Sequence, residues 1–436
     1  EIFNPGEEAV DLSGYTLTDD IRDPVKGPIP AGPTVAAGEY FLFWADGRDE
    51  GQHSSFRLDR DGEEIVLYDP DGALVDMVRF GDQVEDVSYG RVVDGAADWA
   101  YFQQPTPGRK NDGLSFPTAA QAPAPEFLSA GGRYQAPLEV ALTSPSPEAE
   151  IRYTLDSSRP TADSTLYQEP LQVAETTVIR ARAFADGQLA SPIRTSTYLV
   201  GEQTQLPIVS LVTDPVYLWD PEVGIYVDES IDARKDWERP ATIALYEPDG
   251  TSGFQAEASI RLFGRSAIHL PQKSLAIFIQ DPGNGDDHLN YPLFPDDDLG
   301  QYSSFLLRSA SDDWAGAMLR DGFGQEILTG YMELGTQAFR PALLYINGSY
   351  FGIHNIREKQ NEDYLVTRYG ADLDALDLLF VGHNHGDGST DLETLHGHAG
   401  DYEELVAFAQ SHDLTAPENF SSVQAALNTS HFIDYI

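Results

Sequence analysis

The chain has 436 residues, and its 71 acidic and 27 basic side chains give a formal net charge of −44. A surface this acidic excludes general binding to the phosphate backbone of nucleic acids, because like charges repel. The absence of cysteine excludes disulfides, thiolate metal sites and a cysteine nucleophile. The 41% hydrophobic content, with 21 Phe and 21 Tyr, indicates folded modules, and the length predicts two to four of them.

The acidic residues are spread along the whole chain and do not form one tail. We interpret them as a salt-adapted, solvated surface, with divalent-cation sites as the alternative, since carboxylate oxygens suit calcium. No run reaches the roughly 20 apolar residues of a membrane helix, so we predict no membrane span. The chain starts at Glu1 without a signal-peptide pattern, and we expect that a leader was removed or lies upstream.

Residues 1–113 read as a small β sandwich of short alternating strands separated by Asp-Gly or Gly turns, such as 39–44, 64–68 and 74–80. Its opening Phe3-Asn-Pro-Gly6 and residues 10–20, with Pro105-Thr-Pro-Gly108 near its end, resemble the lamin-tail domain of bacterial secreted proteins. That resemblance implies that part of the first strand lies upstream of Glu1.

Residues 114–123 are small, uncharged and Pro-containing, which is typical of a linker. Residues 124–200 then show period-2 runs at 138–142, 151–155 and 177–184, which predict a second, immunoglobulin-like β sandwich. The phrases Ile151-Arg-Tyr-Thr-Leu-Asp156 and Ser196-Thr-Tyr-Leu199 resemble the chitobiase/hexosaminidase C-terminal module. This implies an accessory role without catalysis.

From residue 206 to 436 the pattern changes to α+β. Strands are predicted at 206–212, 241–246, 256–263 and 273–279, and a helix at about 314–329, although Gly322 and Gly324 weaken it. The Asn347-Gly348 dipeptide predicts a tight hairpin between 342–346 and 349–353. Residues 358–369 can start a helix, and 402–436 read as mostly helical with a break near Thr415.

The order of strand with Lys273, helix, hairpin and helix is the order of the small lobe of a protein kinase. Residues 260–266 with 271–274, Leu319-Arg-Asp321 with Glu326, and 345–353 with Arg357-Glu358 resemble, in order, motifs of the CotH family. The resemblance implies an atypical protein-kinase-like domain, ATP with Mg²⁺ or Mn²⁺ as cofactors, and phosphorylation of extracellular or surface proteins.

The resemblance assigns roles to four residues. Lys273 would neutralise the nucleotide phosphates, and Glu326 would hold Lys273 unless it is an ordinary exposed helix residue. Arg261 would contact phosphate or only pair with a nearby acid. Glu358 would mark the hinge that follows the hairpin, or serve as a first-turn acid of the next helix.

The family's metal-holding Asp and Asn are expected beyond the segment that matches residues 432–436. Phosphoryl transfer needs those groups, so we expect this piece alone to be inactive.

A competing metal constellation comprises His383, His385, Asp387, His396 and His398, whose short spacings suit a zinc or nickel site or, equally, an exposed polar loop. Residues 281–287 and 296–298 resemble calcium loops without the EF-hand spacing, which makes Ca²⁺ a further candidate cofactor.

The sequence therefore predicts a multidomain, secreted or cell-surface protein of bacterial type, with two all-β sandwiches before an α+β kinase-like domain. The function expected is ATP-dependent phosphorylation of extracellular proteins. The alternative is a non-catalytic structural or adhesive surface protein. Glycan or matrix binding by residues 124–200 rests on analogy.

Overall fold

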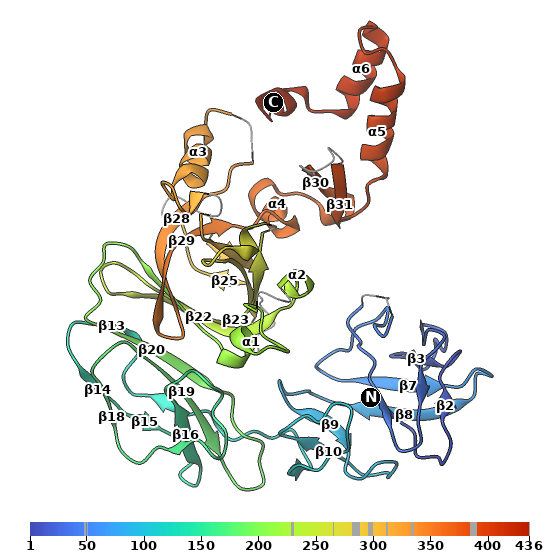
Figure 1. The fold of residues 1–436 in the computed structure, drawn as a ribbon, viewed down its shortest axis with the longest axis vertical. Helices are drawn as coiled ribbons and strands as arrows, with labels where there is room; N and C mark the ends of the chain where they lie inside the picture. Colours follow the sequence, from blue (N-terminus) through green and yellow to red (C-terminus); the bar gives the residue numbers. More distant parts are fainter. Residues whose placement is uncertain are drawn as a thin grey trace.

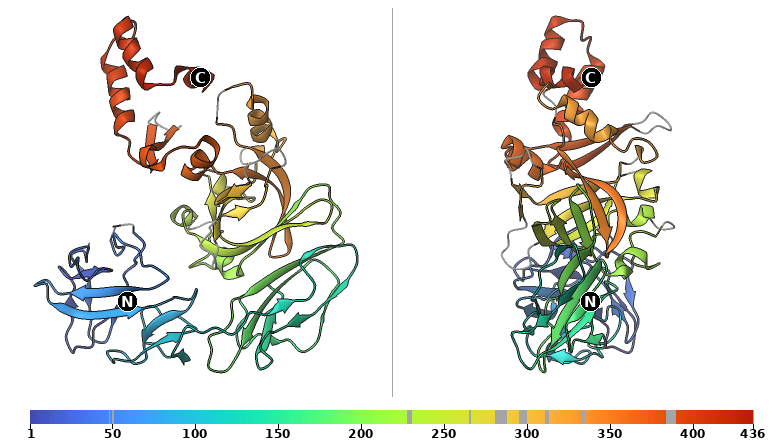
Figure 2. Two further views of the ribbon diagram at one scale, coloured as in Figure 1. Left: turned by 180° about the vertical axis from the view of Figure 1, so that it is seen from behind. Right: turned by 90° about the vertical axis from the view of Figure 1, so that its left-hand side faces the viewer.

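The computed structural model describes residues 1–47, 49, 51–227, 231–264, 266–280, 288–294, 300–310, 313–332, 335–383 and 390–435. The fold is mostly β, with few helices (Figure 1). The N-terminal region, the second β region and a barrel follow one another, and a C-terminal arm with helices extends from the barrel and turns back toward it (Figures 1 and 2).

The first region contains an antiparallel sheet in the order β4-β3-β7-β8, two strand pairs, β1-β6 and β2-β5, and a separate sheet in the order β11-β10-β9. Its small core gathers Leu12, Ile29, Val35, Phe41 and Leu67. The strands are β1 (Ile2–Phe3), β2 (Val10–Asp11), β3 (Thr16–Thr18), β4 (Gly27–Pro28), β5 (Thr34–Val35), β6 (Tyr40–Phe41), β7 (Glu63–Tyr68), β8 (Leu74–Phe80), β9 (Ser88–Arg91), β10 (Trp99–Phe102) and β11 (Ser115–Phe116).

The stretch that the sequence suggested as a linker, residues 114–123, is held at both ends. Strand β11 pairs with β10, and Phe116 packs with Tyr101 and Leu189. The Ala122 N–H donates to the Leu189 carbonyl at 2.8 Å. The stretch therefore fastens the first region to the second.

The second region has a five-stranded sheet, β13-β20-β19-β16-β17, and two pairs, β12-β15 and β14-β18. Val140, Val173, Ile179 and Tyr198 fill the space between the sheet and the β14-β18 pair, as expected for two packed β layers. The strands are β12 (Glu126–Phe127), β13 (Gly132–Tyr134), β14 (Leu138–Val140), β15 (Leu142–Thr143), β16 (Glu150–Thr154), β17 (Thr165–Leu166), β18 (Leu171–Val173), β19 (Thr177–Phe184) and β20 (Arg194–Val200). The prediction of two successive β regions is confirmed.

The third region is built around a closed barrel in the order β21-β22-β23-β24-β27-β29-β28, in which β28 and β21 close the wall as a parallel pair. Its strands are β21 (Ile208–Val212), β22 (Arg239–Tyr246), β23 (Ser252–Phe263), β24 (Ser274–Gln280), β27 (Ser304–Arg308), β28 (Phe339–Ile346) and β29 (Ser349–Glu358), and a small pair joins β25 (Leu289–Asn290) to β26 (Gln301–Tyr302). Alternate residues such as Ile260, Leu275, Ile277, Phe305 and Ile356 point inward and form the largest core of the described chain.

The predicted Asn-Gly hairpin is confirmed. Asn347 and Gly348 have φ angles of 51° and 77°, and Ile346 pairs with Ser349 across the turn. Positive φ at both positions is what a type I′ turn requires, and Asn and Gly tolerate it best. The Asn347 side chain also accepts a hydrogen bond from the Thr213 N–H at 2.9 Å, which ties the turn to the end of β21.

The helices of the third region are short. They are α1 (Pro215–Trp219), α2 (Ile231–Arg234), α3 (Arg320–Leu328), α4 (Glu362–Tyr369) and the 3₁₀ turns η2 (Ser266–His269) and η4 (Leu373–Ala375). The helix predicted at 314–329 is confirmed over its second half, as α3. A Cβ on Gly322 would lie 2.7 Å from the ring of Phe339, so glycine allows α3 to lie directly on β28.

The C-terminal arm begins with the hairpin β30 (Leu378–His383) and β31 (Thr390–His396). Helices α5 (Gly400–Ser411), α6 (Pro417–Ala426) and α7 (Thr429–Tyr435) follow, which confirms the helical prediction and the break before Pro417. Neither α5 nor α6 buries a residue. No helix in the described ranges is both long enough and apolar enough to cross a membrane.

Candidate functional site

The outer side of the barrel wall at β23, β24, β27 and β29 carries cations. Arg261 pairs with Ala276, Ala276 with Leu306, and Leu306 with Arg357, so these four residues form one row across the sheet. Their sequence neighbours face the apolar interior, and alternation therefore places the row outside. We call the outer side chains of Arg261, Arg308, Arg357 and Lys359 the cationic face.

Two cations of this face converge on one aromatic ring. The Arg261 guanidinium lies 5.0 Å and the Lys359 ammonium 5.3 Å from the ring centre of Phe278. Such contacts are favourable, but the two like charges repel each other. Burial, and then the charge of Arg261, lower the pKa of Lys359. Neither cation forms an ion pair within the described part of the chain, although acids are plentiful in the sequence.

The other two cations share one carboxylate. Arg357 is fully buried and donates to Asp321 Oδ2 at 2.7 Å and to Gln337 Oε1 at 3.0 Å. The Arg308 Nε lies 2.9 Å from the same Asp321 oxygen. Two guanidinium groups therefore face one carboxylate, which leaves an excess positive charge next to α3.

The start of α3 is fixed by Asp313, which places Asp321 against the barrel. The Asp313 carboxylate accepts the N–H groups of Ala317, Leu319 and Arg320 at 3.0–3.1 Å and serves as the cap that Leu319 cannot provide. These hydrogen bonds, chiefly that from Arg320, lower the pKa of Asp313. Asp321, in the first turn, then reaches Arg308 and Arg357.

Lys273 lies directly before β24 and is buried. Its ammonium donates to the carbonyls of Ile268 at 2.7 Å and Leu270 at 3.2 Å, and it lies 5.7 Å from the ring centre of Tyr226. Tyr226 and Ile268 belong to the barrel core. Lys273 therefore lies on the inner side of the wall and holds the η2 turn, whereas Arg261 lies on the outer side.

The structure does not bring Lys273 and Glu326 together. The Glu326 side chain is exposed on α3 and makes no ion pair among the described residues. Glu326 follows Asp321 by five residues, which corresponds to about 140° around a helix at 3.6 residues per turn. Since Asp321 faces the barrel, Glu326 is turned away from it.

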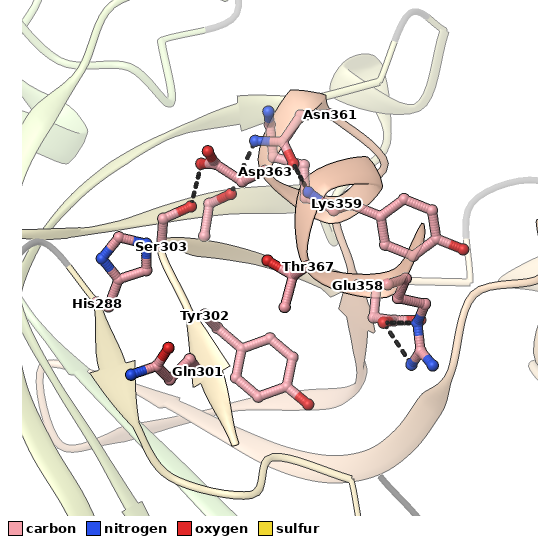
Figure 3. A pocket seen from close by; sticks show the side chains of 12 residues that line it. His288, Gln301, Tyr302, Ser303, Glu358, Lys359, Asn361, Asp363 and Thr367 are labelled. Atoms are coloured by element: carbon pink, nitrogen blue, oxygen red, sulfur yellow. Dashed lines mark hydrogen bonds and ion pairs between the residues drawn. The ribbon is translucent and has the colours of Figure 1, made fainter. Parts of the chain in front are cut away.

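Glu358 ends β29 and is buried. Its carboxylate accepts the Ala338 N–H at 2.8 Å and pairs with Arg368 of α4 at 2.6 Å. It borders a pocket between β26, β27 and α4, where Lys359 and Asn361 also lie (Figure 3). Asn361 caps α4 by accepting the Tyr364 N–H at 3.2 Å. Glu358 thus fixes α4 at the edge of the cationic face.

The remaining lining residues of this pocket are mostly polar. Ser303 donates to Asp363, and the Asn361 amide lies 3.4 Å from Ser304 Oγ (Figure 3). The others are His288, Gln301, Tyr302, Tyr364, Thr367 and Arg368.

The histidine constellation is only partly visible. His385 and Asp387 lie outside the described residues, as do the candidate calcium loops at 281–287 and 296–298. His383 ends β30. His396 Nε2 lies 3.0 Å from the Leu373 carbonyl, and His398 Nδ1 lies 3.8 Å from Asp377. Within the ranges that the structure describes, no three acidic or histidine side chains are placed to hold a metal ion.

Sequence reasoning named Arg261 but missed the rest of the cationic face. Arg357 and Asp321 were quoted within motifs without a role of their own. Arg308 and Lys359 carried no motif. The available signal was that Arg308 and Arg357 each follow an apolar residue, Leu307 or Ile356, which alternation places inside the barrel.

Three parts of the chain match family models. Residues 1–82 match the Lamin Tail Domain, residues 129–195 the chitobiase/beta-hexosaminidase C-terminal domain, and residues 260–436 the CotH kinase protein family. No curated protein matches the chain. Among solved structures, Drosophila N-cadherin EC1-3 aligns over 65% of this chain and 88% of that chain at 12% identity. Its TM-score of 0.10 is too low to indicate a shared fold. The chain therefore carries a lamin-tail region, a chitobiase-type region and a CotH region, in the order that the motifs predicted.

Proposed function

We propose that this chain belongs to a secreted or cell-surface protein that binds ATP with Mg²⁺ or Mn²⁺ and transfers phosphate to extracellular or surface proteins. The proposal includes the finer fold description, with immunoglobulin-like sandwiches in the first two regions and a kinase-like arrangement in the CotH region. The observation that carries it is the cationic face, which gathers four cations in a chain of net charge −44.

The unpaired cations support an anionic ligand. Holding Arg261 and Lys359 beside one ring raises the free energy of the empty site, and an oxyanion between them would remove the repulsion. In a chain with 71 acidic residues, a purely structural cation would readily find a carboxylate partner. A phosphate group fits this chemistry, because guanidinium and ammonium groups both bind phosphate oxygens.

The described residues suit the phosphate groups of a nucleotide, but they do not define a site for its metal ion. The Nε atom of Arg357 is buried without a hydrogen-bond acceptor, which leaves one donor of the cationic face free for an anion. The described residues offer no three-ligand group for Mg²⁺, so none is assigned to it. ATP would supply the transferable phosphoryl group. Arg261 and Lys359 would neutralise its charge, Lys273 would hold the η2 turn after β23, and Glu358 would fix α4.

The alternative is a non-catalytic structural or adhesive surface protein, with Ca²⁺ as its cation. One observation favours it, namely the continuous packing between the chitobiase-type region and the barrel, which suits a scaffold. Binding of glycan or matrix by the chitobiase-type region would belong to the same alternative.

Calorimetric titration of the intact chain with ATP–Mg²⁺ separates the two functions. We expect binding, and we expect Lys359→Met to weaken it by about tenfold to a hundredfold, since one charged hydrogen bond is worth roughly 1.5–3 kcal/mol. Lys110→Met, at an exposed position in the first β region, is the matched control and should bind like the parent chain. If the titration with ATP–Mg²⁺ shows no heat of binding, the scaffold alternative remains.

A further inference from the structure

The chitobiase-type region and the barrel meet through strand β20, which is buried on both faces. Thr195, Ser196, Thr197, Tyr198 and Leu199 are each at most 6% exposed. Successive residues of a strand point to opposite sides. Tyr198 packs into the core of the chitobiase-type region, whereas Leu199 packs with barrel residues. The sheet of this region therefore has its own core on one side and the barrel on the other.

The residues of β20 that face the barrel make a regular series of contacts. The Thr195 carbonyl accepts from Gln255 of β23 at 3.0 Å, and the Thr195 hydroxyl accepts from Thr242 of β22 at 3.2 Å. Two residues later, the hydroxyl of Thr197 lies 2.8 Å from that of Ser210 on β21. This period of two is the signature of sheet packed on sheet.

The contact between β20 and the outer wall of the barrel is called the joint below. Its barrel side is equally regular. Ile208, Ala244, Tyr246 and Tyr345 form a buried cluster with Leu199, and Leu343 packs against it. These residues lie on the outer faces of β21, β22 and β28. An outer barrel wall with apolar and fully buried side chains needs a permanent cover.

Arg133 closes the edge of the joint. Its guanidinium donates to four carbonyls, those of Glu202 and Thr204 in the connection and those of Glu247 and Pro248 after β22. Arg133 itself lies on β13, which pairs in parallel with β20. One side chain therefore joins the second region, the connecting segment and the barrel.

We infer that the chitobiase-type region is a structural wall of the CotH-type barrel, so that residues 126–358 unfold as one cooperative unit. The region is thus not an accessory module on a flexible tether. Strand β23 extends from the joint at Gln255 to the cationic face at Arg261, so the same wall positions that face. The cooperative unit itself does not depend on the proposed nucleotide binding.

Hydrogen exchange followed by mass spectrometry on the intact chain, across a urea series and without nucleotide, tests the inference. We expect peptides from β19 and β20 to lose protection at the same urea concentration as peptides from β21 and β22, because each sheet exposes its second buried face when the other unfolds. If β21 and β22 stay protected at urea concentrations where β19 and β20 exchange completely, the inference is wrong.

A matched pair of substitutions localises the effect. Arg133→Gln should speed exchange in β21 and β22 as well as in β20. Arg152→Gln lies in the same region, but its side chain bonds only Glu150 and Ser164 of that region, so the substitution should leave β21 and β22 unchanged. Equal rates of hydrogen exchange in β21 and β22 for the two variants would overturn the inference. If Arg133→Gln does not fold, the urea series on the unmodified chain still decides.

Discussion

The two outer faces of the barrel have opposite chemistry. Under the chitobiase-type region, the buried hydroxyls of the two sheets are matched, as those of Thr197 and Ser210 are at 2.8 Å. On the cationic face, Arg261 and Lys359 converge on Phe278 without an ion-pair partner in the described chain. Matched burial is what a structural contact requires, whereas cations held together in an acidic chain indicate a ligand. We therefore propose that the barrel uses one face for assembly and the other for binding.

The largest effect on stability is expected when the buried cation that anchors the cationic face to α3 is removed. Arg357→Met should lower the free energy of unfolding by about 3 kcal/mol, because a fully buried guanidinium loses its charged hydrogen bonds to Asp321 and Gln337. Urea unfolding measures the loss. Arg79→Met, which breaks an exposed pair with Glu64, should cost less than about 1 kcal/mol. Similar losses in the two variants would show that α3 is not held by Arg357.

The barrel interior, which lies behind both outer faces, can be tested through the pH dependence of stability. Burial lowers the pKa of His354 from 6.5 to about 4, and its ring lies 3.1 Å from the Lys273 carbonyl and 3.2 Å from Gln272. The unfolded chain therefore binds a proton between these pH values that the folded chain does not. Stability should fall by about 3 kcal/mol as the pH drops from 6.5 to 4.

His354→Gln should flatten that part of the stability–pH curve, measured by urea unfolding at each pH. His412→Gln, at an exposed position on the arm, should not change it. A curve of unchanged slope in His354→Gln would place the acid sensitivity elsewhere.

The orientation of α3 on the barrel can be sharpened with two neighbouring glycines. A Cβ at position 324 meets nothing within 4 Å, so Gly324→Ala should stabilise the chain by about 0.5–1 kcal/mol through helix propensity. At position 322 the Cβ would clash with Phe339, so Gly322→Ala should destabilise the chain. Thermal unfolding of both variants measures the effect. Opposite signs support the packing of α3 that points Asp321 inward and Glu326 outward.

Local chemistry made part of this fold predictable. The Asn347-Gly348 turn, the strands and the break before Pro417 follow from short-range patterns, because each depends on backbone preferences of neighbouring residues. The joint at β20 was harder to predict, since its Thr and Ser residues resemble the solvent-facing half of an alternating strand. Only the meeting of two distant sheets turns them into buried contacts.

The cationic face depends on register across four strands. Arg261 and Arg357 share a row only because β24 and β27 lie between them in the closed barrel. The sequence predicted a pair between Lys273 and Glu326 from family order. The rotation of α3 is set by the contact of Gly322 with Phe339, and the inward direction of Lys273 by the η2 turn. Neither is encoded in the spacing of the motifs.

Comparing Arg261→Ala with Lys273→Ala in an ATP–Mg²⁺ titration and a thermal unfolding scan tests the cationic face most directly. We predict that Arg261→Ala weakens binding about tenfold or more and leaves the melting temperature nearly unchanged, since the guanidinium forms no ion pair. Lys273→Ala should instead lower the melting temperature, because two buried carbonyls lose their donor. Full affinity in Arg261→Ala, with binding lost in a normally stable Lys273→Ala, would contradict the account and place the phosphates at Lys273.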